Sequence, residues 1–580
     1  MRIFSWLKEK PSFFKSWASF FSFKRFFGSV FALSKKEKII FVFLFGLGSL
    51  GLVWFGYKFY LNRTKLIPRI GGVYAEGVVG APRYINPAIT DLSPAEELIE
   101  SIVFSSLLRP DNQGGVETDL AESVERFENG KVYLVTLKKD LYWQDNERLT
   151  ANDVAFSLEL LKNPELKNPN AEFWREVQVE ILSDITLRFT LSRPYYFFPY
   201  YLTFKVLPRH LWSEIQANAF VFSDLNLKPI GSGPYKFKRM LQNKDGLISQ
   251  MSFVRFDKYY LEGPYLETIN LRFFSNQTEA ETALRKKEID SLVGFASEGK
   301  DFNSFEVKTI PYLRIFGLFF NTENEILSDR KLRQAIDLAI NKQEIIDRVF
   351  AGQAKTASSP IIKTEFIDQG GSLFDPDSAR QNLSQLGWQD KDEDGILEKR
   401  LSSKDKLPTK LELSLLLQDL PELMSVGQII KENLSKLGIS VILKPMSLNE
   451  FSSRLQARSY QMVLVGQANV SGNQPDPYPF WHSSQTSAPG LNFSFYQNQE
   501  ADRILDQLRL NFQEQERQEL YQDLDQLIRQ NQPASFLYSP RFVWVVNQSF
   551  ILPEIKQLNN LGDKFSRINL WHLYQKRVWD

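Results

Sequence analysis

One acidic segment has the residue types and the spacing of a metal-binding loop. Asp390, Asp392 and Asp394 are followed by a glycine, which matches the start of the DxDxDG pattern that holds calcium through carboxylate oxygens. Glu398 falls at the ninth position of that pattern, but the twelfth is Leu401, where a bidentate glutamate should complete the loop. A calcium site is therefore the weaker interpretation, and an acidic turn between a helix end and a hairpin is the alternative that we favour.

Residues and motifs that could support catalysis or bind other metals are few. The chain has no cysteine, which excludes disulfides, thiolate metal sites, cysteine nucleophiles and lipid attachment through a cysteine. The three histidines (His210, His482 and His572) are too scattered to predict a histidine-rich metal site. No phosphate loop, GxGxxG, HExxH or GxSxG motif occurs, and GSGPY at 231–235 predicts a tight turn before a strand. We expect no enzyme and no cofactor, although paired carboxylates for hydrolysis stay open among 69 acidic residues.

An apolar segment near the N-terminus predicts a membrane anchor. Residues 39–57 read IIFVFLFGLGSLGLVWFGY, 19 residues without a charge, which can cross the hydrocarbon core as a helix. The basic residues before it place residues 1–38 in the cytoplasm and the large remainder outside, by the positive-inside rule. A cleaved signal peptide is the alternative. We favour an uncleaved anchor, because the span is long and no A-x-A site follows it.

The charge of the chain is distributed unevenly. Residues 1–57 hold nine Lys or Arg against two Glu, and subtracting this +7 from the total of +1 leaves −6 for the rest. A net acidic main part does not favour nucleic-acid binding. Within residues 13–27, eight aromatic residues alternate with Lys15, Lys24 and Arg25. This segment could lie along the inner leaflet, and a disordered tail is the alternative.

Strand and helix patterns alternate after residue 70, without a visible repeat. Runs rich in β-branched, leucine and aromatic residues predict strands over 131–137, 186–191, 269–274, 313–320, 411–417, 441–443 and 462–465. Apolar periodicity and capping residues predict helices over 151–161, 378–386, 422–437, 499–511 and 514–530, and a helix pair that ends at Gly352. The sequence therefore predicts a mixed α/β protein.

Several segments together resemble one known family. GGV at 71–73 with YINP at 84–87, the long block 118–164, GSGPY at 231–235, the helix pair 330–352, and Asp-Pro at 476–477 with FLYSP at 536–540 occur in the family's order. They are similar to the family 5 extracellular solute-binding proteins, the peptide- and nickel-binding group that serves ABC importers. Gln144 and Asn146 depart from the histidine and glycine that are usual there.

The resemblance implies a periplasmic-binding-protein type II-like α/β fold, with two ligand-gripping lobes and an extra inserted lobe. The expected parts are a cytoplasmic segment 1–38, an anchor 39–57, a linker 58–70, lobe I over 71–111, 229–321 and 533–580, extra lobe II over 112–228, and lobe III over 322–532. The chain should cross between the gripping lobes near 318–321 and again near 532–538. Lobe closure over a ligand would then be the functional motion.

The resemblance also places a ligand site. In the family the ligand lies extended between the lobes and pairs with main-chain groups as an added strand. Transferred by position, the expected contacts are Tyr84, Ile85, Asn86, Gln467, Ala468, Asn469 and Tyr538. Peptide binders of the family hold the ligand's ammonium group with an aspartate that this chain lacks, because no acid lies between residues 462 and 475. Either Asp476 or another acid takes that role, or the ligand has no free amino terminus.

The expected function is the solute-binding subunit of an ABC importer, with an oligopeptide as the first choice of ligand. Its partners would be a permease and, through it, ATPase subunits, with the chain as a monomer. Few histidines disfavour free nickel, whereas a metal–chelate or a sugar stays open. Two alternatives use other chemistry. The first is a tethered sensor or adaptor with the same fold, and the second is an extracytoplasmic hydrolase.

Overall fold

The computed structural model describes residues 34–89, 93–111, 114–166, 168, 170–294, 304–368, 374–402, 407–469 and 475–579. The chain divides into two units. The first joins Met1–Arg69 with Gln575–Asp580, and the second is Ile70–Tyr574. The basic, aromatic segment expected over 1–38 lies outside the described residues up to residue 33.

The first unit consists of a long helix and a two-stranded ribbon. Helix α3 (Lys35–Asn62) begins at a capping box formed by Ser34 and Glu37, and none of its residues is buried. In the described part of the chain it is the one helix that is long and apolar enough to cross a membrane. Strand β1 (Thr64–Arg69) follows and pairs with β22 (Tyr574–Trp579). Residues 58–70, expected as a linker, are therefore the end of a helix and a strand. The strand's partner is about 500 residues away, so local patterns cannot indicate it.

In the second unit, a first sheet is built around β2 (Val73–Val79), which runs parallel to β11 and β12. Its other strands are β9 (Tyr235–Gln242), β10 (Ile248–Arg255), β11 (Thr268–Phe274), β12 (Ser291–Val293), β13 (Phe305–Pro311) and the second half of β21 (Ala534–Asn547). Helices α4 (Pro94–Val103) and α9 (Gln277–Arg285) contact it. The core on the α4 side includes the fully buried Tyr74, Tyr235 and Trp571.

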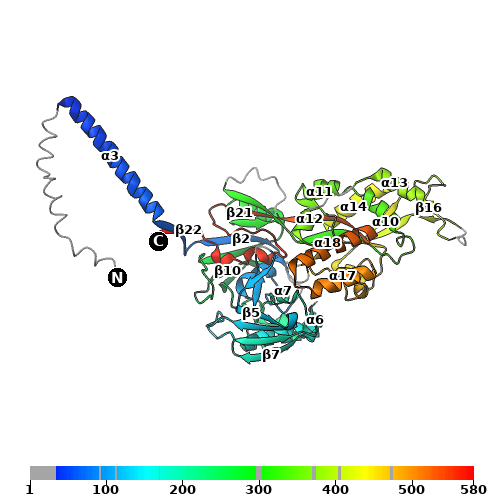
Figure 1. Ribbon diagram of the computed structural model, residues 1–580, viewed down its shortest axis with the longest axis horizontal. Helices are drawn as coiled ribbons and strands as arrows, with labels where there is room; N and C mark the ends of the chain where they lie inside the picture. Colours follow the sequence, from blue (N-terminus) through cyan, green and yellow to red (C-terminus); the bar gives the residue numbers. More distant parts are fainter. Residues whose placement is uncertain are drawn as a thin grey trace. The chain divides into compact units, whose positions relative to one another are not determined.

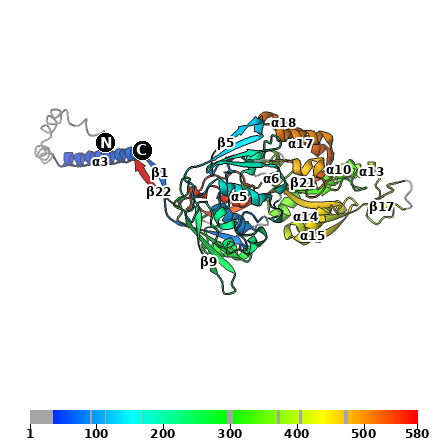
Figure 2. The ribbon, with the colours of Figure 1, turned by 90° about the horizontal axis from the view of Figure 1, so that it is seen from below.

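A second sheet carries the other large core. Its strands are β14 (Arg314–Phe320), β15 (Ala354–Thr356), β18 (Glu412–Gln418), β19 (Ser440–Met446), β20 (Met462–Ala468) and the first half of β21. Strand β18 is parallel to both β19 and β20. The helices of this part are α10 (Arg330–Ala339), α11 (Lys342–Phe350), α12 (Thr364–Asp368), α13 (Pro376–Gln385), α14 (Pro421–Ser435) and α15 (Leu448–Gln456). Figure 2 shows α10, α13, α14 and α15 gathered on one side of the unit.

Strand β21 belongs to both sheets. Its residues Ala534–Pro540 pair with β14 and β15, and Arg541–Asn547 pair with β13 and β12. The chain also passes from the first sheet to the second between β13 and β14, at residues 312–313. The two crossings therefore lie at 312–313 and 540–541, rather than near 318–321 and 532–538. The apolar runs give no sign of the change, because both halves of β21 are equally buried.

A third, smaller sheet lies within residues 112–228. It has the order β5 (Ala121–Phe127), β6 (Val132–Leu137), β8 (Thr186–Thr190), β7 (Gln178–Ser183), all antiparallel. Figure 1 shows β5 and β7 in a group of their own, beside α6 (Ala171–Glu176) and α7 (Phe198–Tyr201). The remaining elements are β3 (Leu108–Pro110), β4 (Val116–Thr118), α5 (Ala151–Lys162), α8 (Arg209–Trp212), β16 (Glu398–Lys399), β17 (Thr409–Lys410), α16 (Tyr478–Trp481), α17 (Gln499–Leu510) and α18 (Glu514–Asn531).

The local predictions are confirmed to within a few residues. For example, Thr150 and Asp153 form the expected capping box of α5, and the helix pair that ends at Gly352 is α10 and α11. The mixed α/β class follows from these elements together.

Candidate functional site

A cavity of about 940 Å³ is lined by residues from both large sheets. The first sheet and its helices contribute Pro94, Glu97, Val293, Gly294, Phe542 and Val543. The second contributes β14 residues, the stretch from Leu464 to Ala468 of β20, Tyr538, and residues of α11, α14 and their flanking loops. The chain crosses between the two sheets at 312–313 and 540–541.

One edge of β20 is open where it faces this cavity. On one side β20 pairs with β14 along its whole length. On the other side β18 pairs with Met462 and Val463 alone, so Leu464 to Ala468 have no strand partner there among the described residues. Unpaired backbone N–H and C=O groups at a strand edge can bind another extended chain. The residues with the open edge all line the cavity.

Aromatic rings form one wall. The rings of Phe316 and Tyr538 stack with centroids 4.9 Å apart and an interplanar angle of 4°, and Phe350 lies 4.6 Å from Tyr538. Gly466 lies opposite Phe316 in the β14–β20 register, and a Cβ there would come within 2.9 Å of the Phe316 ring. The glycine therefore lets the ring lie flat against β20. Burial raises the pKa of Tyr538, and the nearby Glu422 charge adds to this.

Four charged side chains line the cavity among the described residues: Glu97, Arg314, Glu422 and Arg541. Glu97 accepts a hydrogen bond from the Leu561 backbone N–H at 3.1 Å. Burial raises the pKa of Glu97, while the Leu561 N–H and the Arg314 charge oppose that rise. Arg314 lies 3.8 Å above the Tyr312 ring centroid and donates to the Tyr312 hydroxyl at 2.6 Å. An apolar cavity with two carboxylates and two guanidinium groups suits a ligand that carries both signs of charge.

Three of the seven contacts expected by position line this cavity: Gln467, Ala468 and Tyr538. The amide Nε2 of Gln467 is buried without a hydrogen-bond partner, which leaves a donor for a ligand. Asn469 instead donates to the Ile362 carbonyl at 3.1 Å and is absent from the lining.

The segment Tyr84, Ile85 and Asn86 does not line the cavity. Ile85 and Asn86 are fully buried, and the Ile85 N–H donates to the Asn226 carbonyl at 3.0 Å. The Asn86 Oδ1 accepts from the Ala88 N–H at 3.0 Å, which closes a local turn. The Asn86 Nδ2 is buried without a hydrogen-bond partner, although the residue does not line the cavity. A ligand contact by this segment therefore stays a prediction.

Asp476 is occupied by protein partners. Its carboxylate accepts from Arg509 Nη2 at 2.7 Å, from the Tyr195 hydroxyl at 2.7 Å and from the Tyr478 N–H at 3.1 Å. The residue is 3% exposed and does not line the cavity. The Asp476 carboxylate is thus directed at protein partners in this structure. Glu97 and Glu422, which sequence reasoning did not single out, stand at the cavity instead. Both lie in the first turns of helices, where acids are common, so their sequence context carries no functional signal.

The acidic loop lies between α13 and the β16–β17 hairpin. The carboxylates of Asp390, Asp392 and Asp394 come within 4.8 Å of one another and are exposed. The Lys410 ammonium ion-pairs with Asp392 at 3.0 Å and also contacts Asp394, so a cation of the protein already offsets part of the negative charge of the group. Glu398 is 6% exposed in β16 and is not part of the cluster. These contacts fit an acidic turn better than a calcium loop.

A second cavity of about 330 Å³ shares Glu97 with the first. It is lined by further charged residues, among them Glu100, Lys205 and Asp563. Glu100 is 6% exposed, and its Oε1 is buried without a hydrogen-bond partner. Burial raises the pKa of Glu100 well above its ordinary range and lowers the pKa of Lys205. These charges are held at a high desolvation cost beside the main cavity.

Comparison with known proteins relates the chain to one family. The model of the bacterial extracellular solute-binding proteins, family 5 Middle, matches residues 115–490. The oligopeptide-binding protein AppA of Bacillus subtilis (strain 168) is 26% identical over 499 residues, 84% of this chain and 88% of that protein. The nickel-binding periplasmic protein of Escherichia coli (strain K12) is 24% identical over 479 residues, 78% of this chain and 86% of that protein.

Two solved structures show the same fold. The structure of AppA from Bacillus subtilis in complex with a nonapeptide has a TM-score of 0.70 and 25% identity, covering 88% of this chain and 100% of that chain. The structure of NikZ from Campylobacter jejuni in complex with Ni(L-His) has a TM-score of 0.70 and 26% identity, covering 86% and 99%.

Proposed function

Because the chain belongs to the family 5 bacterial extracellular solute-binding proteins, the peptide- and nickel-binding group of ABC importers, we propose that its ligand is an extended oligopeptide. It is an extracytoplasmic binding protein of a non-enzymatic family. Its contribution to import is capture of the solute and delivery to a permease, whose ATPase subunits supply the energy.

The open edge of β20 is the observation that carries the peptide proposal. An oligopeptide can satisfy the free backbone groups of Leu464 to Ala468 as an added strand, whatever its sequence. None of the three histidines lines the cavity, which disfavours a nickel ion bound by protein histidines. AppA, a relative over most of both chains, has been solved with a nonapeptide.

The charged residues of the cavity would hold the ends of the peptide. Glu97 and Glu422 are the carboxylates that can meet an α-ammonium group, in place of the aspartate that the family resemblance leads one to expect. Arg314 and Arg541 can meet a carboxylate. Gln467, Ala468 and Tyr538 complete the contacts from the second sheet, with the stack of Phe316 and Tyr538 as an apolar floor.

We also propose that α3 is an uncleaved anchor and that the exported part has three lobes with different roles. With the observed crossings, lobe I is 71–111, 229–311 and 541–573, lobe II is 112–228, and lobe III is 314–540. Lobes I and III close over the peptide, and lobe II buttresses them. The protein acts as a monomer beside its permease.

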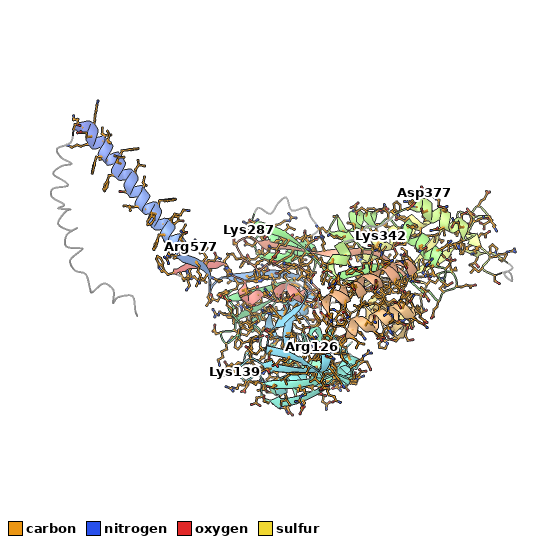
Figure 3. All side chains as sticks on the ribbon, viewed as in Figure 1. Arg126, Lys139, Lys287, Lys342, Asp377 and Arg577 are labelled. Carbon is orange, nitrogen blue, oxygen red and sulfur yellow. The ribbon has the colours of Figure 1, made fainter. Side chains whose placement is uncertain are left out.

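Native mass spectrometry of the gently purified full chain tests the ligand. Peptides of a narrow length range are the expected result, because the edge of β20 has a fixed length. Glu97→Gln and Glu422→Gln should each weaken the binding of peptides with a free amino terminus more than the binding of N-acetylated peptides. The reason is that only a free amino terminus carries an ammonium group. Asp377→Asn, at an exposed residue away from the cavity, is the matched control (Figure 3).

A bound sugar or metal–chelate would contradict the peptide and keep the binding-protein role. An empty protein that no peptide mixture stabilises would contradict import, and it would favour the tethered sensor or adaptor.

A further inference from the structure

The last strand of the chain returns to the end of the apolar helix. Strand β22 pairs with β1, which begins two residues after α3 ends (Figures 1 and 2). Thr64 connects these elements. Its hydroxyl donates to the Tyr60 carbonyl at 2.6 Å and accepts from Arg577 Nη1 at 3.1 Å. The Trp579 ring meets the Tyr60 ring edge-on at 5.6 Å. The ribbon is therefore tied to the last turn of α3 from both strands.

Large apolar side chains of the ribbon and of the last turn of α3 are exposed to solvent. Trp579 is 63% exposed, Leu66 51% and Phe59 50%, whereas aromatic residues of the second unit are mostly buried. Tryptophan and tyrosine side chains collect at membrane–water interfaces, where one end is apolar and the other wet. An exposed aromatic group directly after a membrane-length helix fits that position better than it fits bulk water.

The ribbon and the end of α3 are rich in basic residues. Residues 58–69 and 574–580 hold six Lys or Arg against one acid, Asp580. They are Lys58, Arg63, Lys65, Arg69, Lys576 and Arg577, and Figure 3 shows Arg577 beside the end of α3. A net basic ribbon contrasts with the net acidic remainder of the exported chain. Phosphate headgroups are the chemistry that clustered lysine and arginine at a membrane surface attract.

The lengths agree with a position among the headgroups. The uncharged run 39–57 spans about 28 Å as a helix, close to the roughly 30 Å of the hydrocarbon core. The next five residues of α3 rise about 7 Å further, which is about the thickness of the headgroup layer on one side. Strand β1 then starts where that layer meets water.

We propose that the β1–β22 ribbon docks on the membrane that α3 crosses, with Tyr60 and Trp579 at the interface and the basic side chains on phospholipid phosphate groups. This rests on the proposed anchor role of α3. The ribbon makes the attachment a two-point one, because β22 ties the chain's last strand to the same surface as its anchor. The second unit is then held near the membrane by both ends of its chain.

Spin labels at single cysteines in the full chain test the docking, since the natural chain has no cysteine. The protein is placed in phosphatidylglycerol nanodiscs with a label at Tyr574→Cys in β22. We expect that label to be less accessible to a water-soluble nickel chelate than a fully exposed site, because the ribbon lies against the headgroup layer. Phe222→Cys, at a residue that is 84% exposed in the second unit, gives the reference for full exposure to water. A label at residue 574 that is as open to the chelate as the reference overturns the proposal.

Further variants distinguish docking of the ribbon from anchoring by α3, and contacts with headgroups from steric shielding of the label. A label at Leu47→Cys reports on α3. If the label at residue 47 is shielded from the chelate while the label at residue 574 is accessible, α3 is a membrane anchor but the ribbon does not dock. If the label at residue 47 is itself accessible, both proposals are wrong. The double variant Lys576→Gln/Arg69→Gln should raise chelate access at residue 574 about twofold, because two phosphate contacts are lost. Lys431→Gln/Lys444→Gln, two exposed lysines of the second sheet region, should not. Equal access in both double variants overturns the headgroup contacts.

Discussion

Arg509 holds Asp476 by two nitrogens at once, with Nη2 2.7 Å and Nε 2.9 Å from the same carboxylate oxygen. The Asp476 side chain is 1% exposed and that of Arg509 16%. The Tyr195 hydroxyl donates to the same oxygen, so the pair joins the loop after β8 to the region before α16. An acid that sequence reasoning proposed for the ligand is therefore part of the framework beside the cavity.

Asp476→Asn is expected to destabilise the protein by about 3 kcal/mol, because it leaves a mostly buried guanidinium without its counter-charge. Thermal unfolding measures this. Asp377→Asn, which removes an exposed partner of Arg380, should cost less than about 0.5 kcal/mol. Unchanged unfolding together with lost peptide affinity would show instead that Asp476 contacts the ligand.

Lys564 and Glu76 form a second buried pair, 2.7 Å apart, with both side chains fully buried. Lys564→Met should destabilise the protein by about 3–5 kcal/mol, since Glu76 then keeps a buried charge whose remaining partner is the Tyr74 hydroxyl. The double variant Lys564→Met/Glu76→Gln should recover part of this loss. Chemical denaturation compares the three proteins. A double variant less stable than Lys564→Met would contradict the explanation.

Glu100 should make stability depend on pH in a defined direction. Burial raises its pKa above the unfolded value of 4.5, so the folded state holds the proton longer and stability falls as pH rises above 4.5. Glu100→Gln stays neutral at every pH. It should match the parent near pH 4.5 and exceed it at pH 7.5, where each tenfold difference in proton affinity is worth about 1.4 kcal/mol.

Melting temperatures of both proteins across this pH range measure the effect of Glu100. Glu172→Gln, which removes an exposed carboxylate, is the matched control. A Glu100→Gln protein that is less stable than the parent at pH 7.5 would show an ionised Glu100 paired with Lys205.

Gly466→Ala should weaken ligand binding about tenfold. The new methyl group would lie 2.9 Å from the Phe316 ring and force it off Tyr538, and overpacking of this kind costs about 1–3 kcal/mol. Calorimetric titration with a peptide identified by the mass spectrometry measures the loss of affinity. Gly466→Ala/Phe316→Leu makes room for the methyl group but removes the ring stack, so binding should stay weak. Full recovery of affinity would show that the stack does not contribute to the ligand site.

The sequence alone predicted the elements and their class, because helix and strand signals are local. Alternating apolar residues, caps such as Thr150 with Asp153, and the uncharged run 39–57 depend on neighbours within a few positions. The order of motifs along the chain then indicated the family, and with it the expectation of a ligand between two lobes. That expectation named Gln467, Ala468 and Tyr538, which line the cavity.

Tertiary structure decided what depends on partners far apart in the chain. The sheet that each half of β21 joins, the pairing of β22 with β1, and the use of Asp476 by Arg509 are set by packing between distant segments. The residue type of an acid in the sequence does not indicate whether its carboxylate faces a ligand or an arginine. Only the fold distinguishes Glu97 and Glu422, which face the cavity, from Asp476, because burial and counter-charge are properties of position in space.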